Sequence, residues 1–228
     1  MSTIAANIST LESRILSAAR AAQRDPAAIG LLAVSKTKPA DAIREAFAAG
    51  LRDFGENYLQ EALGKQAELT DLPLCWHFIG PIQSNKTRAI AENFAWVHSV
   101  DRLKIAQRLS EQRPEGLEPL NICIQVNVSG EASKSGCTPE DLPALAASIS
   151  ELPRLKLRGL MAIPEPTEDV NAQAAAFAAV RTLRDNLNLP LDTLSMGMSH
   201  DLEAAIAQGA TWVRIGTALF GARNYGQP

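Results

Sequence analysis

The stretch Ile29-Gly-Leu-Leu-Ala-Val-Ser-Lys36 is followed at once by the turn residues Thr37-Lys-Pro39. An apolar run of this length that ends in a turn is typical of a buried strand. A lysine at the carboxyl end of such a strand is costly unless it faces a site, because burial favours the neutral amine. The neutral amine is the nucleophile that forms Schiff bases. The alternative is a lysine that extends its charge into solvent, and Lys36 taken alone favours that alternative.

Seven further apolar runs alternate with helix-like segments along the rest of the chain. The predicted strands span 29–36, 52–56, 74–79, 95–99, 121–128, 155–161, 193–197 and 211–215, and the predicted helices span 2–23, 40–49, 57–68, 84–92, 101–111, 139–150, 169–187 and 201–208. Eight strands alternating with helices favour an α/β fold of the (β/α)8 or TIM-barrel type over a doubly wound sheet. We expect a single barrel domain over residues 1–228, with an extra amino-terminal helix and no second domain. Gly50 and Gly209 lie just past predicted helix ends, where a left-handed cap favours glycine.

Composition excludes several classes of function. Hydrophobic residues make up 46% of the chain and charged residues 21%, and the net charge is −3. These values exclude a disordered chain and predict no nucleic-acid or membrane-surface partner. No apolar stretch approaches the roughly 20 residues of a membrane span, and the start of the chain does not resemble a signal peptide. Three widely spaced cysteines indicate neither disulfides nor a metal site. We expect a cytoplasmic protein.

The ends of the last two predicted strands carry the residues of a phosphate site. In β/α barrels such a site often follows strands seven and eight. Here the seventh strand leads into Ser195-Met-Gly-Met-Ser-His-Asp201, and the eighth reads Trp212-Val-Arg-Ile-Gly-Thr217. The glycines allow a close approach of the backbone, and the hydroxyl groups donate hydrogen bonds.

A helix expected to begin near Ser199 would add free N–H groups and its positive dipole end. Asp201 is expected to face away from the phosphate, because its carboxylate would repel the anion. Alternatively, Ser199 only caps the helix, and Gly197 and Gly216 only serve turns. The occurrence of two such segments at these two strands favours the phosphate interpretation.

Arg214 lies two residues before Gly216 and is expected to point into the mouth of the barrel. Strands one and eight are neighbours in a closed barrel, so Arg214 and Lys36 are expected to lie close together. Three features meet here: a lysine that forms a Schiff base, a phosphate site and a fixed cation. One ligand suits them all, pyridoxal 5′-phosphate (PLP), which carries an aldehyde and a phosphate. Arg214 would then meet the ring nitrogen.

Seven motifs extend this interpretation to a family. They read AVSKTKP (33–39), FGENYLQE (54–61), WHFIGPIQSNK (76–86), HSVDR (98–102), SGEASKSGC (129–137), LSMGMSHD (194–201) and VRIGTALFGAR (213–223). Together they resemble the pyridoxal phosphate homeostasis proteins, also called the YggS or PROSC family, over nearly the whole chain. The resemblance implies the barrel of the amino-terminal domain of alanine racemase, known as fold type III among PLP proteins.

The resemblance also implies particular cofactor contacts. It implies PLP bound as an aldimine on Lys36, and Arg214 near the pyridine nitrogen. The remaining cofactor-binding residues that it implies are Ser199, Gly216 and Thr217 at the phosphate, Asn57 at the mouth, and Met198 and Ile215 beside them. The sequence shows no departure from the family at these positions.

The residues favour a carrier of PLP over an enzyme. Catalysis by PLP depends on the ring acting as an electron sink, which a carboxylate strengthens by keeping the ring nitrogen protonated, whereas an arginine stays charged and cannot accept that proton. Alanine racemases tolerate such an arginine but need a second base, which an additional domain of a partner subunit supplies. Of the two tyrosines, Tyr58 is expected to pack and Tyr225 lies in the tail.

We therefore expect PLP storage or delivery without catalysis, by a monomer, with apo-forms of PLP-dependent enzymes as transient partners. The alternative is a residual amino-acid racemase or another Schiff-base enzyme, such as a class I aldolase.

Three other residues are candidates for lesser roles. Lys134 lies in a glycine-flanked loop that either assists cofactor release or is simply solvated. His77 is expected to be a hydrogen-bonded core histidine. Lys38 is a second candidate for the aldimine. Which enzymes receive the cofactor, and whether transfer is direct, stays open at this stage.

Overall fold

The strands form a closed parallel barrel in the computed structural model, which describes residues 3–129 and 135–222. Each strand pairs with the next in sequence, and the last pairs with the first through Leu32 and Arg214. The strands are β1 (Gly30–Val34), β2 (Asp53–Glu56), β3 (Cys75–Phe78), β4 (Trp96–Val100), β5 (Leu120–Gln125), β6 (Leu155–Met161), β7 (Thr193–Ser195) and β8 (Trp212–Ile215). Closure confirms the predicted (β/α)8 barrel and excludes the doubly wound sheet.

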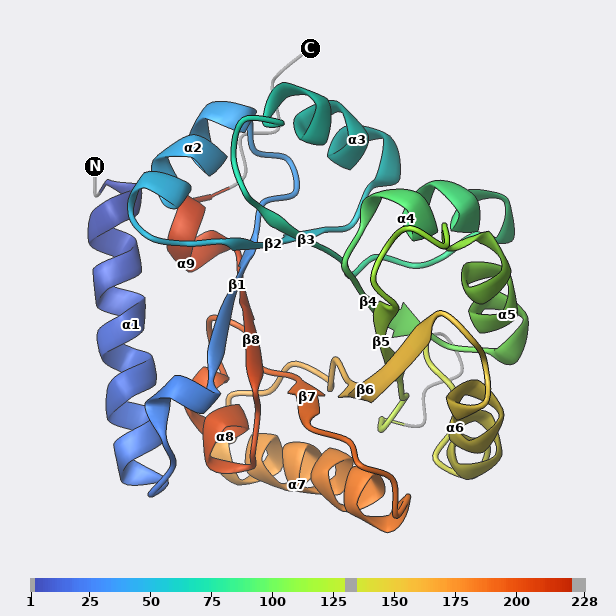
Figure 1. Cartoon of the computed structure of the whole chain (residues 1–228). Helices are drawn as coiled ribbons and strands as arrows, with labels where there is room; N and C mark the ends of the chain where they lie inside the picture. Colours follow the sequence, from blue (N-terminus) through green and yellow to red (C-terminus); the bar gives the residue numbers. More distant parts are fainter. Residues whose placement is uncertain (1–2, 130–134, 223–228) are drawn as a thin grey trace.

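Helices surround this barrel on the outside (Figure 1). They are α1 (Ile4–Ala21), α2 (Ala40–Ala48), α3 (Leu59–Glu68), α4 (Thr87–Asn93), α5 (Leu103–Gln112), α6 (Leu142–Ser150), α7 (Val170–Asn186), α8 (Leu202–Ala207) and α9 (Thr217–Phe220), with 3-10 turns η1 (Pro26–Ala28) and η2 (Ser84–Lys86). None of the helices within the described ranges is long and apolar enough to cross a membrane.

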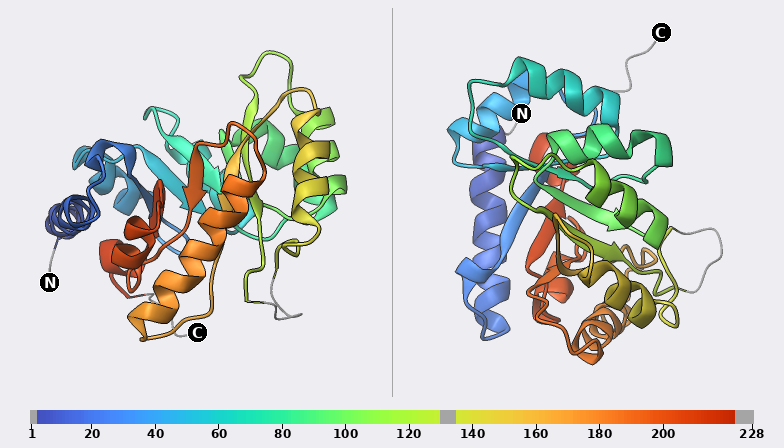
Figure 2. Two further views of the ribbon diagram at one scale, coloured as in Figure 1. Left: turned by 90° about the horizontal axis from the view of Figure 1, so that it is seen from below. Right: turned by 45° about the vertical axis from the view of Figure 1, so that its right-hand side comes forward.

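The extra amino-terminal helix α1 packs along the outside of the barrel against α8 and α9 (Figures 1 and 2). The side chain of Thr3 caps its start by accepting a hydrogen bond from the Ala6 amide. Ile8, Leu11 and Ile15 are buried at the helical spacing of one apolar face. This face brings α1 against the two short helices that follow the predicted phosphate segments.

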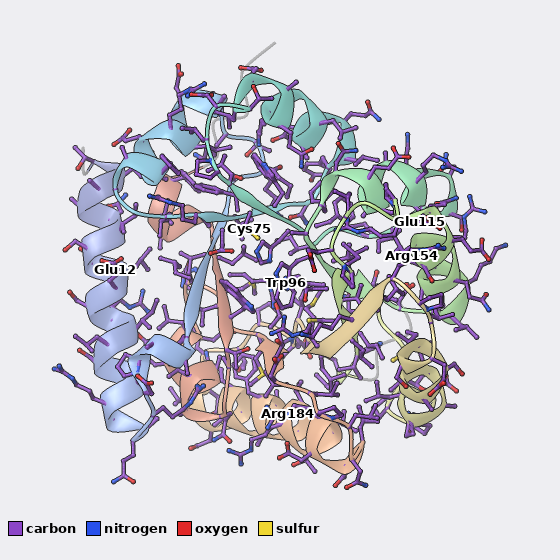
Figure 3. The ribbon with its side chains drawn as sticks, viewed as in Figure 1. Glu12, Cys75, Trp96, Glu115, Arg154 and Arg184 are labelled. Atoms are coloured by element: carbon purple, nitrogen blue, oxygen red, sulfur yellow. The ribbon has the colours of Figure 1, made fainter. Side chains whose placement is uncertain are left out.

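The apolar core has two parts. Most buried apolar side chains belong to one large cluster to which both the strands and the surrounding helices contribute. A small separate cluster consists of Trp96, Cys123 and Met161, from β4, β5 and β6. Figure 3 shows Trp96 near the middle of the ring of helices. The buried polar side chains described below lie next to this second cluster.

Differences from the predicted elements concern their ends. The strand predicted over 29–36 ends at Val34, and the helix predicted over 84–92 divides into η2 and α4. The helices predicted to start at 101 and 139 begin at Leu103 and Leu142. Helix α9 and turn η1 are too short to produce a periodic pattern, so the sequence did not predict them. Gly50 and Gly209 have φ of +107° and +102°, which confirms the predicted left-handed caps.

Candidate functional site

Lys36 lies in a turn two residues beyond the end of β1, and its side chain is half-buried. The prediction that it ends the strand is therefore wrong in detail, although it does lie at the carboxyl-terminal mouth. Thr37, the next residue, has a φ of +64°, an uncommon conformation for a β-branched residue. Lys36, Gly216 and Thr217 line the same small pocket. The ends of strands one and eight thus meet around the lysine.

A cluster of buried charges holds the turn that carries Lys36. We call Ser35, Glu56, Glu61 and Lys65 the Lys65 cluster. Lys65 Nζ donates to the Ser35 carbonyl and to Glu56 Oε1, both at 2.7 Å, and also to Glu61 Oε1. The Ser35 hydroxyl donates to Glu56 Oε1 at 2.6 Å, and the Thr37 amide donates to Glu61 Oε1 at 2.6 Å. The residues on both sides of Lys36 are therefore fixed to one ion cluster.

Glu56 is the most deeply buried charged residue of this cluster. Burial raises the pKa of its carboxyl above the ordinary value, and the Lys65 charge and the hydrogen bonds from Lys65 and Ser35 oppose that shift. Its Oε2 atom has no hydrogen-bond partner among the described residues. The sequence did not predict this cluster, and its only signal was the Glu61–Lys65 spacing of four residues on a predicted helix.

Arg214 lies inside the barrel with 5% of its surface exposed. Its guanidinium donates to the Ser195 carbonyl and hydroxyl and to the Ala162 carbonyl. Desolvation lowers its pKa to about 10, partly offset by the charge of Asp201, so it remains a cation at neutral pH. Three of its hydrogen bonds go to the described residues, and a guanidinium carries five N–H donors. Two donors therefore remain for a ligand.

The segment after β7 differs from its prediction in two respects. Helix α8 begins at Leu202 with Asp201 as its N-cap, so it does not begin near Ser199. Asp201 does not simply face away, because its Oδ1 accepts a hydrogen bond from the Met198 amide at 2.6 Å. The carboxylate closes the turn instead of leaving its amides free. Met198 and Ser199 are both half-buried, and the Ser199 carbonyl accepts a hydrogen bond from Arg14 of α1.

The segment after β8 places its predicted residues in different environments. Gly216 is half-buried and is the N-cap of α9, whereas Thr217 is exposed. Ile215 is completely buried and belongs to the large apolar cluster, so only its backbone is available to a ligand. Gly197 has a φ of +93°, and a Cβ there would lie 2.5 Å from the Ala205 Cβ. Packing against α8 and backbone conformation therefore explain that glycine.

Helix α1 and Lys38 brace both segments from the outside. Asn7 Nδ2 donates to the Leu219 carbonyl at 2.8 Å, and Arg14 also forms an ion pair with Glu203. Lys38 Nζ donates to the carbonyls of residues 220, 221 and 222, at the end of α9. The Lys38 amine is thus engaged in capping a helix, which argues against its use as a second aldimine site.

The residues after β2 complete the mouth of the barrel. Asn57 Oδ1 is buried and has no hydrogen-bond partner among the described residues. Such an orphaned acceptor is unusual in a folded protein and suits a ligand that donates a hydrogen bond. Tyr58 is 55% exposed, so the expectation that it packs is wrong. Lys134 and Tyr225 lie outside the described residues. The core assignment of His77 is confirmed, because it is fully buried and hydrogen-bonded.

Comparison with known proteins identifies relatives over the whole chain. The family model of the alanine racemase N-terminal domain matches residues 3–224. A pyridoxal phosphate homeostasis protein of Pseudomonas aeruginosa is 78% identical over 228 residues, which covers 100% of this chain and 99% of the relative. A protein of the same name from Escherichia coli K12 is 53% identical and covers 99% of each chain.

Solved structures agree with these relatives. PipY of Synechococcus elongatus, solved with PLP bound, is 44% identical with a TM-score of 0.85 over 96% of this chain and 100% of PipY. Alanine racemase of Corynebacterium glutamicum shares the fold, with a TM-score of 0.69 at 18% identity over 99% of this chain and 62% of the racemase. The chain belongs to the family of pyridoxal phosphate homeostasis proteins, built on the alanine racemase N-terminal barrel.

Proposed function

We propose that this protein binds PLP covalently through Lys36 and holds it for storage or delivery. The observation that carries the proposal is the meeting of Lys36 with Gly216 and Thr217 around one pocket, at the adjoining ends of β1 and β8. The Lys36 amine would condense with an aldehyde and release one water molecule. The fixed turn between Ser35 and Thr37 supports this role, because it orders the backbone of the nucleophile before the ligand arrives.

The remaining donors fit the rest of the cofactor. The two free N–H donors of Arg214 suit the ring nitrogen, and the orphaned Asn57 Oδ1 suits a donor on the ring. We assign the phosphate to the hydroxyl groups of Ser199 and Thr217 and to the backbone at Gly216, with Met198 and Ile215 beside them. The buried Asn57 Oδ1 in particular has no partner among the described residues, so a donor on the ligand would be a driving force for binding.

We further propose that the bound cofactor has little catalytic power. PLP supplies an electron sink in enzymes that keep its ring nitrogen protonated. Arg214 stays charged with a pKa of about 10, so it donates to that nitrogen and offers no proton acceptor. The competing function is a residual racemase. Its specific support is Tyr58, which follows Asn57 in the sequence after β2 and is 55% exposed.

The test is covalent labelling followed by transfer. Wild-type protein, Lys36→Ala and the neighbouring control Lys38→Ala are incubated with PLP, reduced with borohydride and analysed by peptide mass. We expect the cofactor mass on Lys36 in wild type and Lys38→Ala, and no labelling at that position in Lys36→Ala. Unchanged labelling of Lys36→Ala at another residue would contradict the assignment.

The loaded proteins are then mixed with an apo-form of a PLP-dependent enzyme, whose recovered activity measures delivery. Incubation with L-alanine and chiral analysis tests the racemase alternative. Formation of D-alanine that is lost in Tyr58→Phe would favour the enzyme over the carrier. We propose that the carrier acts as a monomer in the cytoplasm, and sedimentation equilibrium of the loaded protein tests its mass.

A further inference from the structure

A chain of buried side chains leads from Arg214 across the inside of the barrel. The Arg214 guanidinium donates to Ser195 Oγ at 2.9 Å, and Ser195 Oγ lies 2.7 Å from His98 Nδ1. His98 Nε2 lies 2.9 Å from His77 Nδ1, and His77 Nε2 lies 3.0 Å from Asp53 Oδ1. The five side chains come from β8, β7, β4, β3 and β2. Asp53 begins β2, so this row of hydrogen-bonded side chains ends at the mouth of the barrel opposite to the one where Lys36 lies.

Each hydrogen atom that is shared between these five side chains has one possible position. A guanidinium only donates and an ionised carboxylate only accepts. Because Asp53 only accepts, a neutral His77 is the Nε2–H tautomer, and its Nδ1 is then an acceptor. A neutral His98 therefore donates from Nε2–H to His77 Nδ1, and its Nδ1 accepts the hydrogen of the Ser195 hydroxyl. The Ser195 oxygen keeps a lone pair that accepts from Arg214. The hydrogen bonds therefore run in one direction, from the cation to the carboxylate.

The surroundings keep both histidines neutral. His77 stacks on Trp96 with ring centroids 5.5 Å apart and meets the edge of Trp212 at 5.1 Å (Trp96 is labelled in Figure 3). Burial lowers the pKa of His77, and the charge of Asp53 opposes that shift. Burial lowers the pKa of His98 further, and the neighbouring His77 and the charge of Arg214 act in the same direction.

Two thiols also lie near these side chains. Cys75 Sγ lies 3.4 Å from His77 Nε2, and burial raises its pKa to about 12, with Asp53 adding to the shift. Cys123 of β5 is completely buried, and its pKa is likewise raised to about 12 by desolvation. Both thiols are therefore protonated and neutral at physiological pH, so neither disturbs the charges at the two ends of the chain.

We propose that Ser195, His98, His77 and Asp53 are positioning residues that fix the orientation of Arg214 toward the cofactor. This inference rests on the proposed binding of PLP at Arg214. A serine held as an acceptor by its hydrogen bond to His98 directs one Nη1–H of the guanidinium away from the mouth. The remaining N–H donors of Arg214 thereby stay oriented toward the ligand. Asp53, at the far end of the barrel, then influences cofactor binding without touching the cofactor.

The first test needs no cofactor. Nitrogen-15 spectra of the histidine side chains in the apo-protein distinguish the two neutral tautomers from the imidazolium form. The sequence contains three histidines, and exposed His200 serves as an internal control. We expect His77 and His98 to be Nε2–H tautomers from about pH 6 to 8. An imidazolium or an Nδ1–H tautomer at either residue would overturn the proposed direction, whether or not PLP binds at Lys36.

The second test measures release of bound cofactor. We expect Ser195→Ala and Asp53→Leu to release PLP about fivefold faster than wild type, as the loss of one net hydrogen bond predicts. The absorption band of the bound cofactor should shift in both variants. Asp53→Asn keeps an oxygen acceptor for His77 and should behave like wild type.

The matched control is Ser110→Ala, which removes a buried serine hydroxyl bonded to the Pro153 carbonyl, away from this chain. It should lower thermal stability without changing the release rate or the spectrum. If both Ser195→Ala and Asp53→Leu release PLP at the wild-type rate and show the wild-type spectrum, the proposal is overturned. Failure of the wild type itself to bind PLP would instead contradict the proposed function.

Discussion

Lys65 is the residue whose removal tests the ion cluster beneath Lys36. Its ammonium is the cation beside Glu56, and the two side chains are 7% and 0% exposed. Lys65→Met keeps the length of the side chain but leaves the Glu56 carboxylate buried without its partner. We expect the free energy of unfolding to fall by about 3–5 kcal/mol. Urea unfolding followed by circular dichroism measures this change.

Two comparisons separate the charge effect from a loss of packing. Lys104→Met replaces an exposed lysine and should change stability by less than about 0.5 kcal/mol. The double variant Glu56→Gln/Lys65→Met removes both charges and should be more stable than Lys65→Met alone, because no uncompensated charge remains buried. A double variant less stable than the single one would contradict this account of the cluster.

At the scale of elements, the packing of α8 against the end of β7 depends on Gly197. An alanine there has an unfavourable positive φ and also brings its Cβ to 2.5 Å from the Ala205 Cβ. Gly50 has a similar φ of +107°, but a Cβ there meets nothing within 4 Å. Both Gly→Ala changes should cost about 1–2 kcal/mol in backbone strain.

Gly197→Ala should cost about 1–3 kcal/mol more than Gly50→Ala, because α8 must shift to relieve the overlap. Denaturant midpoints of the two variants give the difference directly. Equal destabilisation would mean that α8 moves without resistance and that only the backbone conformation requires glycine at 197.

The elements also show what the sequence pattern can reveal. Apolar runs predicted every strand, but the prediction carried β1 to Lys36, whereas the strand ends at Val34. The chain leaves the strand there because Glu61 and Lys65 bind the backbone on both sides of Lys36. Those partners lie 24 and 30 positions away in sequence, so a local pattern does not contain them. The predicted helix 201–208 starts within one residue of α8, but the expected N-terminus near Ser199 was wrong, because Asp201 is the N-cap.

On the scale of the whole molecule, the topology was easier to predict than the contacts between side chains inside the barrel. A closed barrel follows from eight alternations of strand and helix, and closure pairs β1, which leads into Lys36, with β8, which carries Arg214. The chain from Arg214 to Asp53 could not be predicted in this way. Five strands each contribute one inward side chain, and sequence spacing does not indicate which inward groups meet. His77 could be assigned to the core, but its pairing with His98 required the fold.

Two buried neutral histidines give the whole molecule a predictable sensitivity to acid. The pKa values of His77 and His98 in the folded state lie below their ordinary values because of burial. Above about pH 6.5, the two histidines are mostly unprotonated in both the folded and the unfolded protein, so protonation does not reduce the free energy of unfolding. Below that pH, the unfolded chain takes up protons that the folded barrel excludes. Stability should therefore fall with decreasing pH by up to about 1.4 kcal/mol per pH unit for each histidine.

Urea unfolding at several pH values measures this slope, and variants assign it to residues. His98→Gln should be less stable at pH 7 but should lose roughly half of the dependence on pH, because one of the two protons is no longer excluded. His200→Gln, which changes an exposed histidine, should keep the full dependence. Glu56 has the opposite effect on the dependence of stability on pH, because its raised pKa makes the folded state bind a proton more tightly. This effect is the same in the wild type, His98→Gln and His200→Gln. A slope in His98→Gln equal to that of the wild type would show that His98 does not stay neutral inside the barrel.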